Sequence, residues 1–155
     1  MRRKPAIVAV GTLAIGVMLL GANVASAGSD DNQAATIHII DTDQQVALQD
    51  FNHNGPDFGD LVAFRSTDTD LQGKPVGHGI GQVTLLGAHD NSLTVTLVLA
   101  KGDITMQGDI TGLQSGARSR IAVTGGTGRY AKARGFTDTR QIADGVTDLV
   151  IHLNP

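Results

Sequence analysis

The side chains that first suggest chemistry are the oxygen-bearing ones at residues 50–57, which read Asp-Phe-Asn-His-Asn-Gly-Pro-Asp. They place carboxylate and amide oxygens at alternate positions and a glycine at the sixth, like the first half of a calcium-binding loop. The twelfth position is Leu61 instead of a bidentate glutamate, although Asp57 or Asp60 could take that role in a non-helical loop. The alternative is a plain turn held by Asp and Asn side chains. The pattern leaves both interpretations open.

A glycine-rich motif, Thr-Gly-Gly-Thr-Gly-Arg-Tyr-Ala, occupies residues 124–131 and follows an apolar stretch at residues 121–123. It superficially matches a dinucleotide fingerprint, which requires a helix after the glycines and an acidic residue about 20 positions later. Only 27 residues follow Gly128, and they alternate as strands do. We therefore interpret the motif as a turn whose backbone bends or passes close to a neighbour, and we expect no nucleotide cofactor.

Other site chemistries have little support in the sequence. There is no cysteine, which excludes disulfides, a thiol nucleophile and thiolate metal sites. No serine lies on a nucleophile elbow. No two histidines have metal-ligand spacing on one element, so we expect no bound metal. The five histidines are His38, His53, His78, His89 and His152.

Apolar and polar residues alternate with a period of two along most of the chain, as strands require. Leu93, Val95 and Leu97, for example, alternate with threonines and a valine. Glycine, Asp and Asn cluster between such segments, and no helical period is sustained after residue 35. The pattern predicts an all-β fold of about eight antiparallel strands, as a barrel or a sandwich. The expected strands cover residues 35–50, 61–68, 76–86, 93–100, 104–110, 118–124, 135–142 and 146–153.

The amino-terminal segment has the three parts of a secretion signal. Met1-Arg2-Arg3-Lys4 is followed by an apolar run and by Ala25-Ser26-Ala27. We expect a signal peptide at 1–27, a flexible leader at 28–34 and a single barrel domain at 35–155, secreted to the periplasm or the extracellular space. An uncleaved anchor is the rival interpretation.

Removal of this signal leaves nine basic residues against 15 acidic ones, a net charge of −6. All 15 acidic residues are Asp. Because no basic block remains, we expect neither nucleic acid nor a membrane surface as a partner.

Three segments resemble the allene oxide cyclase and dirigent superfamily. Residues 121–136 resemble its glycine-rich signature, residues 58–64 its early Gly-Asp strand, and residues 75–81 its Val-Gly-x-x-x-Gly hairpin. The resemblance implies an eight-stranded antiparallel barrel with an internal pocket, usually assembled as a homotrimer. It also implies a small hydrophobic substrate, whose cyclisation, isomerisation or coupling is guided without a metal or redox cofactor.

The resemblance also assigns candidate catalytic residues. Arg134 falls on the arginine of the dirigent Ala-Arg-Gly element, or else it forms an ion pair with Asp138 or Asp109. Asp50 and Asn52 resemble the acidic residue and asparagine on the first strand of plant allene oxide cyclases. A carboxylate there would act as a general base if burial raised its pKa.

Three further residues are candidates for binding the substrate. Ser66 stands where the cyclases have a second asparagine. His78 faces the pocket or lies partly exposed on its strand, and Tyr130 either hydrogen-bonds a ligand or packs the turn. The sequence therefore favours a secreted barrel that is either a cofactor-independent cyclase or isomerase, or a non-catalytic binder of hydrophobic ligands. A calcium-stabilised extracellular barrel is the third alternative.

Overall fold

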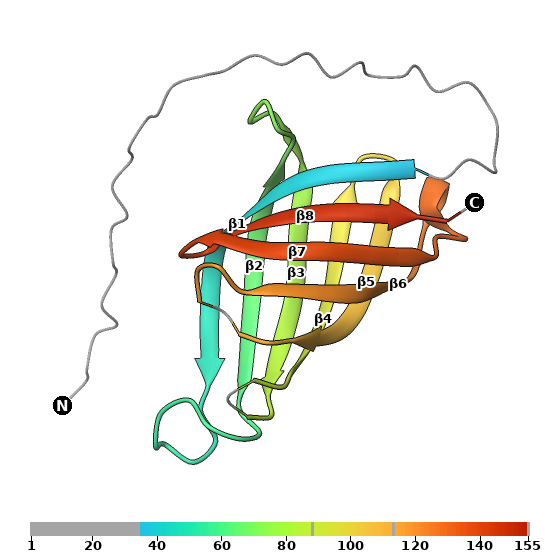
Figure 1. Cartoon of the computed structure of the whole chain (residues 1–155). Coiled ribbons are helices and arrows are strands. Elements are labelled where there is room, and N and C mark those ends of the chain that lie inside the picture. The colour runs from blue at the N-terminus through green and yellow to red at the C-terminus, as the bar shows by residue number, and fades with distance from the viewer. Residues whose placement is uncertain (1–34, 88, 113, 155) are drawn as a thin grey trace.

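The computed structural model describes residues 35–87, 89–112 and 114–154, which form eight antiparallel strands and one short 3-10 helix (Figure 1). The predicted signal peptide and leader lie outside the described residues. No helix in the described part of the chain is long and apolar enough to span a bilayer. The elements are β1 (Ala35–Gln49), β2 (Leu61–Thr69), β3 (Pro75–Leu85), β4 (Asn91–Leu99), β5 (Gly102–Ile110), β6 (Arg118–Gly126), η1 (Gly128–Tyr130), β7 (Gly135–Ala143) and β8 (Val146–Leu153).

The strands form a closed barrel in which each one pairs with the next along the chain. β8 returns to pair with β1, with Ile39 opposite Leu149, so the sheet has no free edge. The predicted all-β, eight-stranded antiparallel barrel is thereby confirmed, and the predicted strand positions agree to within a few residues.

The core follows from the alternation seen in the sequence, because every second side chain of a strand points into the barrel. On β4 the inward-facing residues Leu93, Val95 and Leu97 are buried. On β5, Met106 and Ile104 stand opposite the last two, whereas β3 has glycines there. Further buried members are Ile39, Val83, Ile104, Met106, Ile110, Ile121, Val123, Leu149 and Ile151.

A bulge interrupts this alternation on β1. The pairing with β2 shifts between Asp43 and Gln45, so that Gln44 is an extra residue on β1. Before the bulge the odd-numbered residues point inward, as Asp41 does. After it the even-numbered residues do, and Val46 pairs with the inward-facing Phe64. β1 therefore contributes inward-facing side chains from two different registers.

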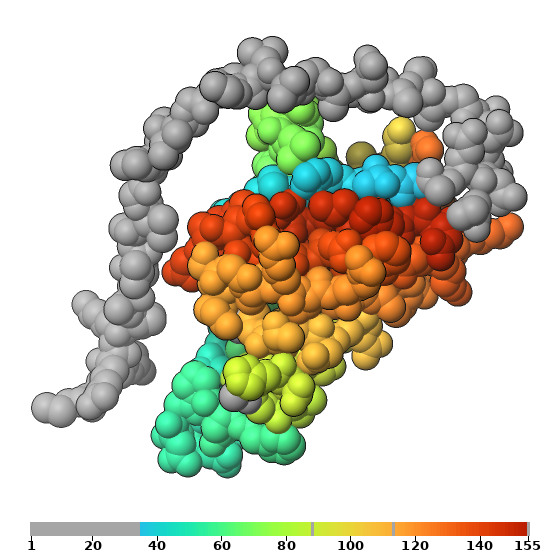
Figure 2. Space-filling model, in the orientation of Figure 1, coloured from blue at the N-terminus to red at the C-terminus, as the bar shows by residue number. Residues whose placement is uncertain are grey.

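The glycine-rich motif forms the connection from β6 through η1 to β7. A Cβ atom at Gly126 would lie 2.3 Å from the carbonyl oxygen of Asp103 and 2.6 Å from that of Tyr130. The interpretation of this motif as a turn with close backbone approach is therefore confirmed. Figure 2 shows the β1–β2 loop and the β2–β3 hairpin projecting from opposite ends of the barrel.

Candidate active site in the barrel cavity

The barrel encloses a cavity of about 480 Å³ that reaches the end formed by the β5–β6 loop and the β7–β8 turn. Gly112 and Ala117 line it on one side of this opening and Asp144 and Gly145 on the other. Its walls are mostly aliphatic and its polar side chains are few, which is the usual composition of a small-molecule site. The apolar lining includes Val46, Val62, Phe64, Val83, Leu93, Val95, Met106, Ile110, Ile121 and Leu149.

Two carboxyl groups from β1, those of Asp41 and Asp43, line this apolar cavity. Burial, opposed by the hydroxyl of Ser66, raises the pKa of Asp41 from 3.8 to about 7. Burial also raises the pKa of Asp43 to about 6, and the neighbouring charges of Asp41 and Asp144 add to the effect. Both groups consequently exchange protons near neutral pH.

Ser66 and Gly79 hold Asp41 in place. The Ser66 hydroxyl donates a 2.5 Å hydrogen bond to Oδ2 of Asp41, and the Gly79 N–H donates a 3.1 Å bond to the Ser66 oxygen. A Cβ atom at Gly79 would lie 2.4 Å from Ser66 Oγ and 2.9 Å from Asp41 Oδ2. This part of β3 therefore has to be glycine for the Ser66–Asp41 pair to fit.

Asp68 lies directly opposite Asp41 in the β1–β2 register and is 0% exposed. Neither of its carboxylate oxygens has a hydrogen-bond partner among the described residues. Burial raises the pKa of Asp68, and the pKa of Asp41 is raised further by its proximity. A proton on either carboxyl would supply the missing donor and would relieve the repulsion between the two groups.

This arrangement is suited to proton transfer. Asp41 retains its proton to a higher pH than Asp43, so the first is the better general acid and the second the better general base. Asp41 is buried among the barrel side chains, whereas Asp43 is half-buried and lies nearer the opening, beside Gly145. The cavity therefore combines a shaped apolar space with two carboxyl groups of different acidity.

The structure places the three predicted catalytic residues away from this cavity. The side chain of Arg134 is exposed and donates to the carbonyl of Ala133 at 2.7 Å. Asp50 and Asn52 lie in the loop after β1. The backbone N–H of Gly55, then those of His53 and Asn52, lower the pKa of Asp50, which is the opposite of what a general base requires.

The ion pair suggested as an alternative role for Arg134 is not formed. Asp138 instead accepts from Arg120, with distances of 2.7 Å from Nε and 3.1 Å from Nη2, and Asp109 accepts from the backbone of Asn91. The Arg120 hydrogen bond holds the pKa of Asp138 below its ordinary value.

The three predicted binding residues have different locations. Ser66 points into the barrel and contacts the cavity carboxyl Asp41. His78 points outward, because Gly77 and Gly79 occupy the inward positions beside it on β3. Tyr130 is half-buried in η1 and packs on the hydrophobic core. Of the six residues, Ser66 is the one that the structure brings to the proposed site.

Sequence reasoning missed Asp41, Asp43 and Asp68. Their signal was present in the alternation, since Asp41 and Asp43 are in phase with the buried Ile39. An acidic residue on the apolar face of a strand is costly to bury and marks a functional position.

The calcium-like loop is satisfied by its own backbone. Asp50 accepts three backbone N–H groups, and Asp60, which is 0% exposed, accepts from the N–H of Phe51 and Asp57. Within the described residues no three His, Asp or Glu side chains are grouped as a metal site. The geometry of this loop is that of the Asx-rich turn.

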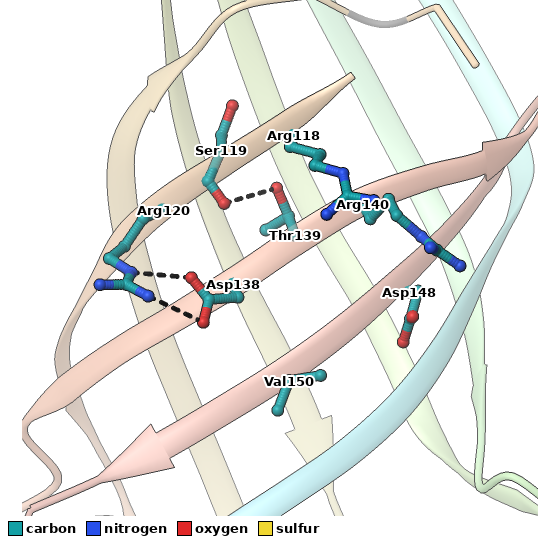
Figure 3. Close-up of a pocket in the computed structure, with 8 residues that line it drawn as sticks. All are labelled: Arg118, Ser119, Arg120, Asp138, Thr139, Arg140, Asp148 and Val150. Carbon is teal, nitrogen blue, oxygen red and sulfur yellow. Dashed lines mark hydrogen bonds and ion pairs between the residues drawn. The ribbon is translucent and has the colours of Figure 1, made fainter. Parts of the chain in front are cut away.

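A second hollow, of about 590 Å³, lies on the outer surface of β6, β7 and β8 (Figure 3). It carries Arg118, Arg120 and Arg140, of which Arg120 pairs with Asp138. Its charged side chains project outward from the strands, so it lacks the apolar enclosure of the barrel cavity (Figure 3).

The fold and the cavity define a class, that of closed antiparallel barrels with an internal small-molecule-sized space. The chain belongs to the family described as the allene oxide cyclase barrel like domain, whose model matches residues 40–151. A search of curated proteins finds no match.

Several solved structures share the fold. A protein described as pyocyanin demethylase is 25% identical, with a TM-score of 0.69 over 77% of this chain and 100% of its own. AbnU, described as an exo-specific intermolecular Diels-Alderase, is 18% identical, with a TM-score of 0.66 over 80% of this chain and 100% of its own. The Diels-Alderase AbmU from Streptomyces koyangensis is 19% identical, with a TM-score of 0.66 over 78% of this chain and 63% of its own.

Proposed function

We propose that this protein binds a small, largely apolar molecule in its barrel cavity and guides its cyclisation or isomerisation by proton transfer. The observation that carries the proposal is the pair of carboxyl groups, Asp41 and Asp43, with raised pKa values in a mostly apolar cavity. Asp41 donates a proton to the substrate atom on which negative charge develops, and Asp43 accepts the proton that another substrate atom releases. The walls select the substrate conformer that reacts.

Membership of the allene oxide cyclase barrel like family is consistent with this chemistry. The neighbours described as Diels-Alderases and as a demethylase all act on small molecules by name. We also propose that the protein is exported by the signal at residues 1–27 and assembles as a homotrimer. Light scattering and sequencing of the mature amino terminus test these two points.

The test of function begins with binding. The neutral fluorescent probe N-phenyl-1-naphthylamine should bind the wild type, and Val95→Trp, which fills the cavity, should abolish its binding. The matched control is Leu71→Trp, at an exposed position outside the cavity. Equal binding by all three proteins would show that the probe does not occupy the barrel.

Catalysis is tested on small molecules extracted from the producing culture. The wild type should convert one component into a product of the same mass, because cyclisation and isomerisation conserve atoms. Asp41→Asn and Asp43→Asn should each slow the conversion about 100-fold or more. Mass spectrometry after chromatography detects the change.

A second candidate is a non-catalytic carrier, which the predominance of aliphatic side chains in the lining favours. Native mass spectrometry that finds a retained ligand, combined with no conversion of any component by the wild type, would select this candidate over the first.

A further inference from the structure

The charged groups that line the cavity are all acidic. Among its described lining residues there are three carboxyl groups, those of Asp41, Asp43 and Asp144, and no Lys, Arg or His. The arginines of the neighbouring strands project from the outer surface, as Arg118, Arg120 and Arg140 do in Figure 3. A ligand in the cavity therefore meets negative charge without a compensating positive group.

The neutral polar groups inside the barrel offer few free donors, because most of their protons already have protein acceptors. Thr147 donates its hydroxyl to Gln141 at 2.9 Å, and the amide of Gln141 donates to the carbonyl of Ala143 at 2.9 Å. Thr139 donates to the carbonyl of Ser119 at 3.3 Å, and Ser66 donates to Asp41. What remains for a ligand is mostly acceptor capacity.

Such a cavity is complementary to donors and positive charge. A carboxylate ligand would be placed in a medium of low polarity beside Asp41 and Asp43, where like charges repel strongly. A neutral ketone or ether would find few donors other than the proton of Asp41. An ammonium group or a protonated ring nitrogen would pair with the carboxylates and satisfy their oxygens.

We propose that the ligand carries an ammonium, amidinium or protonated nitrogen-heterocycle group at one end and an apolar body at the other. The cationic end lies against Asp41 and Asp43, where β1 meets the β7–β8 turn. The backbone there is fixed by a 2.8 Å hydrogen bond from the Asp43 N–H to the Gly145 carbonyl. The apolar body extends toward Val95 and Met106 on the far wall. This inference rests on the proposed function, since it names the substrate class of the same cavity.

Three probes of one shape test the proposal: 2-naphthylmethylamine, 2-naphthylmethanol and 2-naphthoate, which are cationic, neutral and anionic at pH 7.5. The protein has no tryptophan, so the fluorescence of the naphthalene ring reports binding directly. The amine should bind about tenfold or more tightly than the alcohol, which corresponds to about 1.4 kcal/mol. The naphthoate should bind more weakly than the alcohol.

In the double variant Asp41→Asn/Asp43→Asn the affinities for the amine and the alcohol should lie within about twofold of each other. The affinity for the alcohol should stay close to that of the wild type. The matched control is Asp90→Asn, which removes one acidic group from an exposed loop position and should leave the preference for the amine unchanged. Melting curves of each variant establish that it is folded.

The outcomes separate this inference from the proposed function. Binding of none of the three probes, the alcohol included, would contradict the cavity as a small-molecule site. Binding of the alcohol with no advantage for the amine would overturn the cationic ligand and leave the cavity intact. An advantage for the amine that persists in the double variant would also overturn it, because the attraction would then come from Asp144 or from the net negative charge of the protein, and not from Asp41 and Asp43.

Discussion

Asp41 and Asp68 stand directly opposite each other on β1 and β2, and only Asp41 has a hydrogen-bond donor within the described part of the chain. The contrast with Asp60 is instructive, since that residue is equally buried but accepts two backbone N–H groups. An unpartnered polar group in a protein interior costs about 1–3 kcal/mol. The barrel is therefore locally less stable than it could be at the place where we locate the chemistry.

The first prediction concerns the dependence of stability on pH. Asp41 and Asp43 have folded-state pKa values of about 7 and 6, both above the ordinary value of 3.8. Between about pH 4 and pH 7 the folded protein thus binds more protons than the unfolded chain, and the free energy of unfolding falls as pH rises. Urea denaturation from pH 4.5 to 8 should show this decline.

In Asp41→Asn the decline should be shallower, by up to about 1.4 kcal/mol per pH unit for the one proton removed. A wild-type profile that is flat or rises across this window would contradict the raised pKa values. Asp50 and Asp138 have lowered pKa values, so they change the stability only below about pH 4, outside the measured range.

The second prediction is that Asp68→Asn stabilises the protein above pH 7. The amide cannot ionise and can donate a hydrogen bond to Asp41, which removes the cost of an unpartnered buried carboxyl. The midpoint of thermal unfolding should rise at pH 8 and change little at pH 5. The matched control is Asp60→Asn, which should lower the midpoint at both pH values because two backbone donors lose a charged acceptor. Equal losses in both variants would refute the assignment of Asp68.

The third prediction is that Gly79→Ala disrupts the site. The new methyl group would lie 2.4 Å from Ser66 Oγ and 2.9 Å from Asp41 Oδ2, so both side chains must move. We expect the free energy of unfolding to fall by about 1–3 kcal/mol. The free energy of binding 2-naphthylmethylamine should fall by more. The control is Gly87→Ala, where the added atom has no neighbour within 4 Å. If Gly79→Ala bound the amine as the wild type does, Ser66 would not position Asp41.

The fourth prediction concerns Gly135, in the family signature at the start of β7. Its φ is +143°, and a Cβ atom would lie 1.9 Å from the carbonyl oxygen of His152 on β8. Gly135→Ala should destabilise the protein by about 3 kcal/mol or more, because backbone has to move.

Gly116→Ala is the control, since its φ is +90° and the added atom has no neighbour within 4 Å. It should cost only about 1–2 kcal/mol, the price of the positive φ. Equal losses in the two variants would show that strain at positive φ, and not contact with β8, explains the glycine in the signature.

The fold could be predicted because its evidence is local. Alternation placed Leu93, Val95 and Leu97 on one face, and the structure buries all three. The glycines of residues 124–131 marked a connection, because no helical pattern followed them. The closure of β8 on β1 depends on contacts between the two ends of the domain, and for this the family resemblance was needed.

The site was harder to predict because its chemistry depends on burial by distant strands. Burial inside the barrel raises the pKa of Asp41, the neighbouring Asp68 on β2 raises it further, and the hydrogen bond from Ser66 opposes both effects. Asp50 was attractive in the sequence, but its loop supplies backbone donors that favour the charged form. The carboxyl groups of Asp41 in a strand and Asp50 in a turn thus differ in acidity because of burial and backbone donors, which the spacing of residues in the sequence does not show.

The extra residue at Gln44 divides β1 into two independently adjustable halves. Upstream of it, the cavity receives acidic side chains from odd positions, and downstream it receives apolar ones from even positions. Deletion of Gln44 would shift the register of one half of β1 by one residue, so that the inward-facing side chains of that half would point outward. Either Asp41 or Val46 would then leave the barrel interior. Grafting of a β1 segment from a relative therefore has to preserve this frame, whereas substitutions within each half can alter the reactive groups and the shape of the entrance separately.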